Sequence, residues 1–131
     1  MGGGEAMVVI AGIGCRRDCK AAPIIAIIRE AAARTGRAVT RLAAPDFKVN
    51  EQGLREAADV LGLPLVLVAR DALELAQPRC LMQSAHAERA IGVTSVAEAS
   101  ALAEAGPAGR LLLPRISAGG ATCALAEVPA P

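Results

Sequence analysis

The sequence predicts an α/β domain, a three-layer α/β/α sandwich around a mixed, partly parallel sheet of about five strands. In the first half of the chain, aliphatic strand-like segments alternate with segments of helical apolar spacing, which favours parallel strands joined by right-handed crossovers. Near the end, two strand-like segments flank a glycine-bearing turn and predict an antiparallel edge. With 131 residues, the chain has the size of one domain. We expect a flexible N-terminus over 1–6 and a single domain over 7–131.

The first predicted elements are a buried strand and an amphipathic helix. Met7–Ala11 is β-branched and apolar, and Gly12-Ile13-Gly14 is expected to form a tight loop after it. The helix that follows has its apolar residues at helical spacing: Ile24, Ile27, Ile28 and Ala31. Pro23 fits its first turn, where a missing N–H costs little, and Gly36 provides a stop.

A second strand, a second helix and a third strand come next. Ala38–Ala43 is the predicted strand, and Ala44-Pro45-Asp46 the turn after it. Asn50 is the expected N-cap of the helix, and Gly62 its stop. The apolar face of this helix comprises Leu54, Ala57, Ala58 and Leu61. Leu65–Ala69 is almost purely aliphatic, which is typical of a strand in a sheet interior.

Shorter helices are predicted in the middle of the chain. Asp71 is expected to cap a helix through Ala76, and Ser84–Ile91 has the pattern of another short helical segment. Ser95 and Glu98 have the spacing of a capping box, in which each side chain binds the backbone N–H of the other residue. The helix that they begin is expected to end before Gly106-Pro107.

Two strands are predicted to close the chain. Arg110–Leu113 and Ala121–Val128 are apolar, and Ser117–Gly120 between them contains two glycines suited to a turn. We expect a hairpin that adds an antiparallel edge to the sheet.

Composition disfavours several classes of function. Hydrophobic residues make up 53% of the chain, but Phe47 is the only aromatic residue, so single-stranded nucleic acid would lack a stacking platform. The net charge of +1 provides no global field for DNA, RNA or an anionic membrane. The longest apolar run, Ala21–Ile28, is too short for a membrane span. We therefore expect neither nucleic acid nor a membrane as a partner.

The N-terminus and the cysteines favour a cytoplasmic location. The first residues are glycine-rich and lack the basic and apolar segments of a signal peptide. The four cysteines form no CxxC pair of the kind found in zinc and redox sites, and we expect them to be reduced thiols. The sequence predicts no bound metal and no cofactor.

The segment Gly12-Ile13-Gly14-Cys15-Arg16-Arg17 is the strongest candidate for a binding site. Glycines expose backbone N–H groups beside two guanidinium groups and an expected helix start, which together favour an anion. A dinucleotide fingerprint would need glycine in place of Arg17, and a phosphate-binding P-loop would need Gly-Lys-Ser/Thr. The alternative is a tight structural turn with two solvated arginines.

The same segment resembles the GIGCRR signature of the CobE/CbiG C-terminal domain family. Further segments that are similar to this family follow in order: Lys48–Leu54, Leu61–Leu65, Gly92–Ala99 and Thr122–Ala126. The matches span nearly the whole chain, from Met7 to Val128. Two positions depart from the pattern, since Asp18 replaces a common glycine and Asn50 stands where an acidic residue is usual.

The resemblance implies a role in cobalamin biosynthesis. The expected ligand is a precorrin or another corrinoid, whose acetate and propionate carboxylates suit arginine pairs and helix N-termini. CbiG opens a lactone of a cobalt-precorrin and releases acetaldehyde, so a C–C bond hydrolase of that type is one alternative. A non-catalytic tether for other cobalamin-pathway enzymes is another.

The expected ligand-binding residues combine the loop with positions that the resemblance supplies: Gly12, Gly14, Cys15, Arg16, Arg17, Lys48, Glu51 and Ser95. Lys48 and Glu51 have the alternative of an ordinary surface pair, and Ser95 that of a helix cap. No catalytic residue is identified. Cys15 is either a nucleophile or a small packing residue, and the lone His86 either a cobalt ligand or a polar surface residue.

Overall fold

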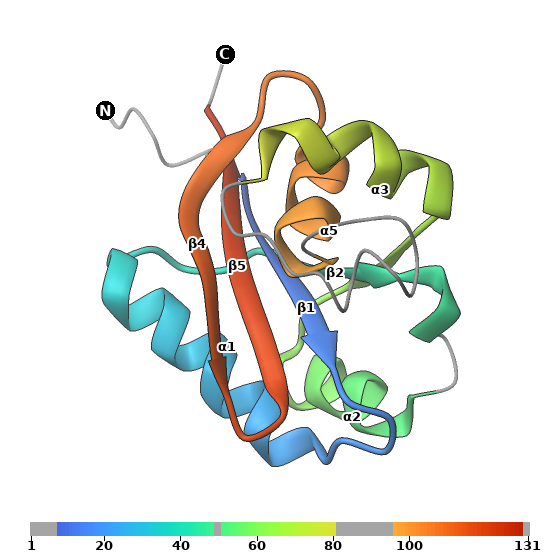
Figure 1. The fold of residues 1–131 in the computed structure, drawn as a ribbon. Helices are drawn as coiled ribbons and strands as arrows, with labels where there is room; N and C mark the ends of the chain where they lie inside the picture. Colours follow the sequence, from blue (N-terminus) through green and yellow to red (C-terminus); the bar gives the residue numbers. More distant parts are fainter. Residues whose placement is uncertain (1–7, 49–50, 81–95, 130–131) are drawn as a thin grey trace.

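The computed structural model describes residues 8–48, 51–80 and 96–129, and Figure 1 shows them as one sheet with helices on either side. The elements, including the two short 3-10 helices η1 and η2, are in chain order β1 (Val8–Cys15), α1 (Ala21–Thr35), β2 (Arg41–Pro45), η1 (Asp46–Lys48), α2 (Gln52–Leu61), β3 (Leu65–Val68), α3 (Arg70–Ala76), η2 (Gln77–Arg79), α5 (Val96–Ala105), β4 (Arg110–Ala118) and β5 (Ala121–Val128). No helix within these ranges is both long and apolar enough to cross a membrane.

The sheet has five strands in the order β3-β2-β1-β5-β4. β1, β2 and β3 are parallel neighbours, whereas β5 runs antiparallel to both β1 and β4. The predicted mixed sheet of about five strands and its terminal hairpin are therefore confirmed. Because β5 lies between β1 and β4, the last strand of the chain is in the interior of the sheet, and β3 and β4 form its two edges.

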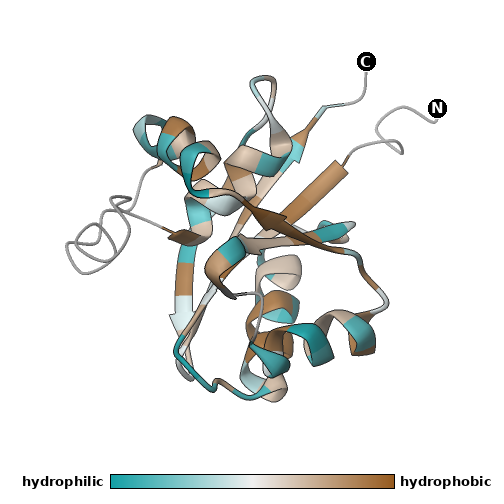
Figure 2. Ribbon diagram, turned by 90° about the vertical axis from the view of Figure 1, so that its right-hand side faces the viewer, coloured by the Kyte–Doolittle hydropathy of each residue, from teal (hydrophilic) through white to brown (hydrophobic). Residues whose placement is uncertain are grey.

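Two hydrophobic cores, one on each face of the sheet, make the predicted three layers. Val9, Ala11 and Ile13 of β1 join the core beneath α1 and α2, while Ile10 faces the core beneath α3 and α5. This alternation follows from the two-residue period of a strand. In Figure 2, the strands at the centre of the molecule are mostly hydrophobic, while the helices carry both hydrophobic and hydrophilic residues.

β1 extends through the glycines that were expected to form a loop. It continues to Cys15, with Gly12 opposite Ala124 and Gly14 opposite Thr122 on β5. The prediction of a loop at Gly12-Ile13-Gly14 was wrong because antiparallel pairing with β5 holds this segment extended. Gly12 serves another purpose, since a Cβ atom there would lie 2.0 Å from the carbonyl oxygen of Ala97 on α5.

β2 begins and ends later than predicted. It covers Arg41–Pro45, so Pro45 belongs to the strand rather than to a turn, and Ala38 lies outside it. The register explains the shift, because Leu42 pairs with Leu65 and Pro45 with Val68 of β3. Just before β2, the Thr40 hydroxyl accepts from the backbone N–H of Val9 at 3.1 Å and donates to its carbonyl at 3.0 Å.

The helix stops were predicted better than the helix starts. Gly36 and Gly62 end α1 and α2 in the left-handed conformation, as expected. The N-cap of α2 is Glu51 and that of α3 is Ala69, so the predicted caps at Asn50 and Asp71 were wrong. Asn50 itself, the helix expected over 84–91 and the Ser95 half of the capping box lie outside the described residues.

β4 is longer than the predicted Arg110–Leu113, because pairing with β5 continues to Ala118 opposite Ala121. The turn consists of Gly119 and Gly120, which have φ values of 63° and 85°. Positive φ at both central residues is what a two-residue hairpin turn of type I′ requires. Two irregularities interrupt the ladder, the second between Leu113 and Ile116.

Candidate functional site

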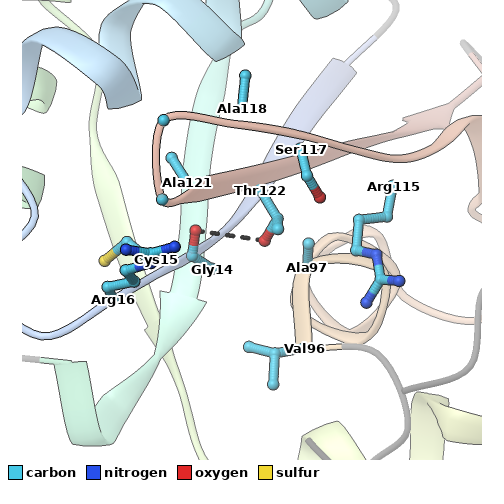
Figure 3. A pocket seen from close by; sticks show the side chains of 12 residues that line it. Gly14, Cys15, Arg16, Val96, Ala97, Arg115, Ser117, Ala118, Ala121 and Thr122 are labelled. Atoms are coloured by element: carbon cyan, nitrogen blue, oxygen red, sulfur yellow. Dashed lines mark hydrogen bonds between the residues drawn. The ribbon is translucent and has the colours of Figure 1, made fainter. Parts of the chain in front are cut away.

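A hollow of about 530 Å³ opens where β1 ends, beside the N-terminus of α5 and the β4–β5 hairpin. Its lining includes Cys15 and Arg16 from the end of β1, Val96 from α5, and Arg115 and Thr122 from the hairpin. Figure 3 shows Arg16 at one side of this hollow and Arg115 at the other. Segments from both ends of the chain therefore build it together.

Arg16 is held at its side of the hollow by the hairpin turn. Its backbone N–H donates to the Gly120 carbonyl at 3.0 Å. A Cβ atom at Gly120 would lie 3.2 Å from Cδ of Arg16, so the glycine leaves room for the arginine stem to lie against the turn. The side chain remains exposed beyond this contact.

Arg115 reaches the hollow from the irregular part of β4. It follows Pro114, within the register shift between Leu113 and Ile116, and bulges of this kind are found where a strand redirects a side chain. The Arg115 backbone N–H donates to the Glu98 carboxylate at 3.0 Å. Glu98 is fully buried in the first turn of α5. Its carboxylate therefore stabilises the irregular part of β4 from inside the protein.

Hydroxyl groups and a helix start complete the hollow. Thr122 donates from its hydroxyl to the Gly14 carbonyl at 3.2 Å, a hydrogen bond drawn in Figure 3, and Ser117 lies on the neighbouring strand. Val96 and Ala97 belong to the first turn of α5, where backbone N–H groups are not used within the helix and the helix dipole is positive.

The described residues that line the hollow include two arginines and no acidic side chain. In the described parts of the chain, neither Arg16 nor Arg115 forms an ion pair. Elsewhere arginines do so, as when Arg37 and Arg110 both bind the buried carboxylate of Glu127 at 2.7 and 2.8 Å. The hollow thus offers guanidinium groups, hydroxyls and main-chain N–H groups, which are the usual partners of carboxylates.

The glycine and arginine segment divides between two roles. Gly14, Cys15 and Arg16 line the hollow, as the sequence suggested. Gly12 lies two residues before Gly14 on β1, where it is buried in close contact with α5. Arg17 is exposed and lies outside the lining, in the turn that joins the Arg16 carbonyl to the Cys19 N–H at 3.2 Å.

Glu51 does not line the hollow. Its carboxylate accepts from the backbone N–H of Asp18 at 2.9 Å, and it lines a separate polar depression of about 320 Å³ between the loop before α1 and the start of α2. Lys48 is the last residue of η1. Ser95 and His86 lie outside the described residues.

Sequence reasoning missed Arg115, Ser117 and Thr122 as a group. Thr122 belongs to a segment that resembles the family, but the pattern of that segment indicates a strand and no ligand. Pro114 was the available signal for Arg115, since proline within a predicted strand marks an edge or a bulge. What brings these side chains to Arg16 is the position of β5 next to β1, which a local pattern does not reveal.

The cysteines fall into two classes. Burial raises the pKa of Cys123 to about 12. Burial, followed by the nearby charge of Glu98, raises the pKa of Cys80 to about 11 despite the opposing effect of Arg79. Cys15 and Cys19 are only partly buried. The described residues contain no group of three or more His, Cys, Asp or Glu arranged to hold a metal ion.

Comparison with known proteins gives consistent matches over almost the whole chain. The sequence profile described as "Cobalamin synthesis G C-terminus" matches residues 9–126. The crystal structure of CobE, a protein from the cobalamin (vitamin B12) biosynthetic pathway, is similar at 39% identity and a TM-score of 0.88, over 94% of this chain and 92% of that one.

Two further structures are similar. The cobalamin biosynthesis protein chiG from Agrobacterium tumefaciens shares 38% identity at a TM-score of 0.76, over 95% of this chain and 100% of that one. A putative cobalamin biosynthesis protein G homolog from Sulfolobus solfataricus shares 23% identity at a TM-score of 0.69, over 92% of this chain and 37% of that one, and it supports the fold alone. No curated protein sequence matched the chain.

Proposed function

This chain belongs to the cobalamin synthesis G C-terminus family, and on that premise we propose that it binds a precorrin-type tetrapyrrole through the carboxylates at the edge of the macrocycle. The proposed site is the hollow between Arg16 and Arg115. Binding there would serve the processing or the transfer of a pathway intermediate.

One observation carries the proposal: two arginines from opposite ends of the chain line a single hollow without an acidic partner among the described residues. A guanidinium group can donate two parallel hydrogen bonds to one carboxylate. Precorrins carry several acetate and propionate groups around the ring, so two separated guanidinium groups can bind two of them. The first turn of α5 adds N–H donors from Val96 and Ala97.

The size of the hollow fits partial enclosure of the ligand. Small-molecule sites generally have volumes of roughly 300–1,000 Å³, and this one has about 530 Å³. We expect one edge of the macrocycle to enter while the remainder stays outside. An open arrangement of this kind suits a protein that passes its ligand to another enzyme.

Binding is favoured over lactone hydrolysis by the chemistry of the lining. Opening a lactone with water needs a general base, most often an imidazole or a carboxylate. The described lining residues contribute arginines, hydroxyls, the Cys15 thiol and small side chains instead, and none of them is an imidazole or a carboxylate. A direct comparison is to incubate the protein with a lactone-bearing intermediate and measure acetaldehyde, which a binding protein does not release.

The binding test compares a carboxylate corrinoid with an amidated one. Equilibrium dialysis with cobyrinic acid, whose side chains are free acids, and with cobinamide, whose side chains are amides, can be followed by the visible absorption of the corrinoid. We expect cobyrinic acid to bind wild type and to bind the Arg16→Ala/Arg115→Ala protein much more weakly. Arg29→Ala, which removes an exposed arginine of α1, is the matched control. Equal binding by wild type and the double variant would exclude this site.

A further inference from the structure

We propose that Glu51 and Glu98 are positioning residues for the two arginines of the hollow, each acting through the main chain of the arginine's own segment. This inference rests on the proposed function, because it concerns how the same hollow is kept ready for an anion. Neither carboxylate is among the residues that line the hollow.

Glu51 acts on the loop that follows Arg16. Its carboxylate accepts from the backbone N–H of Asp18 at 2.9 Å, although the two residues are 33 positions apart in the sequence. Gly53, two residues later, packs against the same loop, since a Cβ atom there would lie 2.0 Å from the Cys19 carbonyl oxygen. The start of α2 therefore contacts the loop at two neighbouring residues, Asp18 and Cys19.

These contacts support a backbone conformation at Asp18 that is uncommon for residues other than glycine. Asp18 has a φ of 61°, in the left-handed region that glycine adopts without cost. With Arg16 and Cys19 at its ends, joined at 3.2 Å, the turn resembles type II, in which the third residue has positive φ. A hydrogen bond from Asp18 to Glu51 holds this turn and, with it, the direction in which the chain leaves Arg16.

Glu98 acts on the opposite wall. Its side chain is fully buried in the first turn of α5, and its carboxylate accepts from the Arg115 backbone N–H at 3.0 Å. Arg115 lies within a register shift, where its N–H would otherwise lose the acceptor that a regular β4–β5 ladder provides. The bond thus ties the position of Arg115 to the helix whose N-terminus faces the same hollow.

Contact through the main chain leaves the guanidinium charges available to a ligand. Glu127 shows the other arrangement, in which a carboxylate binds the guanidinium groups of Arg37 and Arg110 directly and neutralises them. Glu51 and Glu98 instead bind N–H groups. A carboxylate that contacted the ligand itself would repel an acidic corrinoid, so Glu51 strengthens binding only by acting through Arg16.

Two double-mutant cycles test the inference by cobyrinic acid binding. In the first, Glu51→Ala is combined with Arg16→Ala, and in the second Glu98→Ala, which removes the acceptor, with Arg115→Ala. We expect Glu51→Ala to weaken binding roughly five- to tenfold when Arg16 is present, the scale of one ordinary hydrogen bond, and hardly at all once Arg16 is removed. Glu51→Gln keeps an acceptor oxygen and should bind like wild type, and Glu56→Ala, on the exposed face of α2, is the control.

The double variant Glu51→Ala/Asp18→Gly tests whether Glu51 acts on binding through the turn at Asp18. Glycine adopts the positive φ unaided, so Asp18→Gly should restore most of the affinity that Glu51→Ala loses. The amide signals of Asp18 and Arg115 in nitrogen-15 spectra report directly whether each hydrogen bond persists. Because Glu98 is buried, the Glu98→Ala protein is first checked for cooperative unfolding, and the Glu51 cycle alone tests the inference if that protein does not fold.

The outcomes separate this inference from the proposed function. If wild type does not bind cobyrinic acid, the proposed function is overturned, and the inference with it. If wild type binds and Arg16→Ala weakens binding, but Glu51→Ala binds normally or weakens binding equally without Arg16, the inference alone is overturned.

Discussion

The backbone N–H of Arg16 donates to the carbonyl oxygen of Gly120 at 3.0 Å, and this contact joins the end of the first strand to the last hairpin turn. Both residues line the hollow. Through them, a motif near the N-terminus and a strand pair near the C-terminus become one surface. The affinity of that surface for an anion therefore depends on β4 and β5 as much as on the motif.

Arg16 and Arg17 should differ in their effect on ligand binding although they are neighbours. We expect Arg16→Ala to weaken cobyrinic acid binding about tenfold, the scale of one lost charge-assisted hydrogen bond. Arg17→Ala should have an effect within about twofold, as expected for a screened charge outside the lining. Dialysis at two salt concentrations measures both. An Arg17 effect as large as that of Arg16 would contradict the location of the site.

Gly12→Ala should destabilise the protein strongly. The new Cβ atom would meet the Ala97 carbonyl oxygen at 2.0 Å and the Ala101 nitrogen at 2.7 Å, and neither can move without shifting α5. We expect a loss of about 3 kcal/mol in the free energy of unfolding, measured by urea denaturation. Gly14→Ala is the comparison, because its Cβ atom would meet only the Thr122 side chain closely. If Gly12→Ala proved the milder change, the contact between β1 and α5 would be misassigned.

Glu127 should stabilise the fold above acidic pH. Burial raises the pKa of this carboxyl, but hydrogen bonds and charges from Arg110 and Arg37 outweigh that effect and hold the pKa below its ordinary value of 4.5. Its contribution is therefore complete above pH 4.5 and is lost as the pH falls through the lowered pKa. Since both arginines are partly exposed, we expect Glu127→Gln to cost about 2 kcal/mol at pH 7.

The check on Glu127 is a pair of denaturation curves at pH 7 and pH 3 for wild type and Glu127→Gln. The difference between the two proteins should shrink at pH 3. A difference that grew on acidification would mean that folding raises the pKa of this carboxyl instead of lowering it.

Two of the four thiols should react with iodoacetamide in the folded protein. The raised pKa values of Cys123 and Cys80, about 12 and 11, leave almost no thiolate at pH 8. Cys15 and Cys19 are partly exposed and should react first. Cobyrinic acid should slow only the labelling of Cys15, which lines the hollow. Mass spectrometry of the labelled peptides gives the order, and early labelling of Cys123 would refute its burial.

Asp18→Gly should make the protein more stable. The substitution removes the cost of a positive φ at a non-glycine residue, and we expect a gain of about 0.5–1 kcal/mol after allowing for the greater flexibility of glycine. Urea denaturation measures it. Asp59→Gly in α2 is the control, because the same replacement inside a helix should destabilise by a similar amount. Equal loss of stability in both variants would show that the turn at Asp18 imposes no strain.

Local sequence patterns predicted much of the fold. The apolar spacing of Ile24, Ile27 and Ile28 identified the buried face of α1, and the glycines at 36 and 62 identified two helix ends in the left-handed conformation. These features depend on residues within one or two turns of each other. The same local reasoning failed at Gly12, where glycine favours a loop by itself but pairing with β5 and contact with α5 keep the strand extended.

The sequence by itself determined the α/β class, the strand and helix order, the family and one side of the hollow. Each of these follows from the pattern of residues within short stretches of the chain. Only the tertiary structure decided that Arg115 lines the same hollow as Arg16, that Gly12 packs beneath α5 and that Glu51 binds the chain at Asp18. These relationships arise when β5 inserts between β1 and β4. Strand pairing between distant segments is set by the packing of the whole sheet, and no short stretch of sequence encodes it.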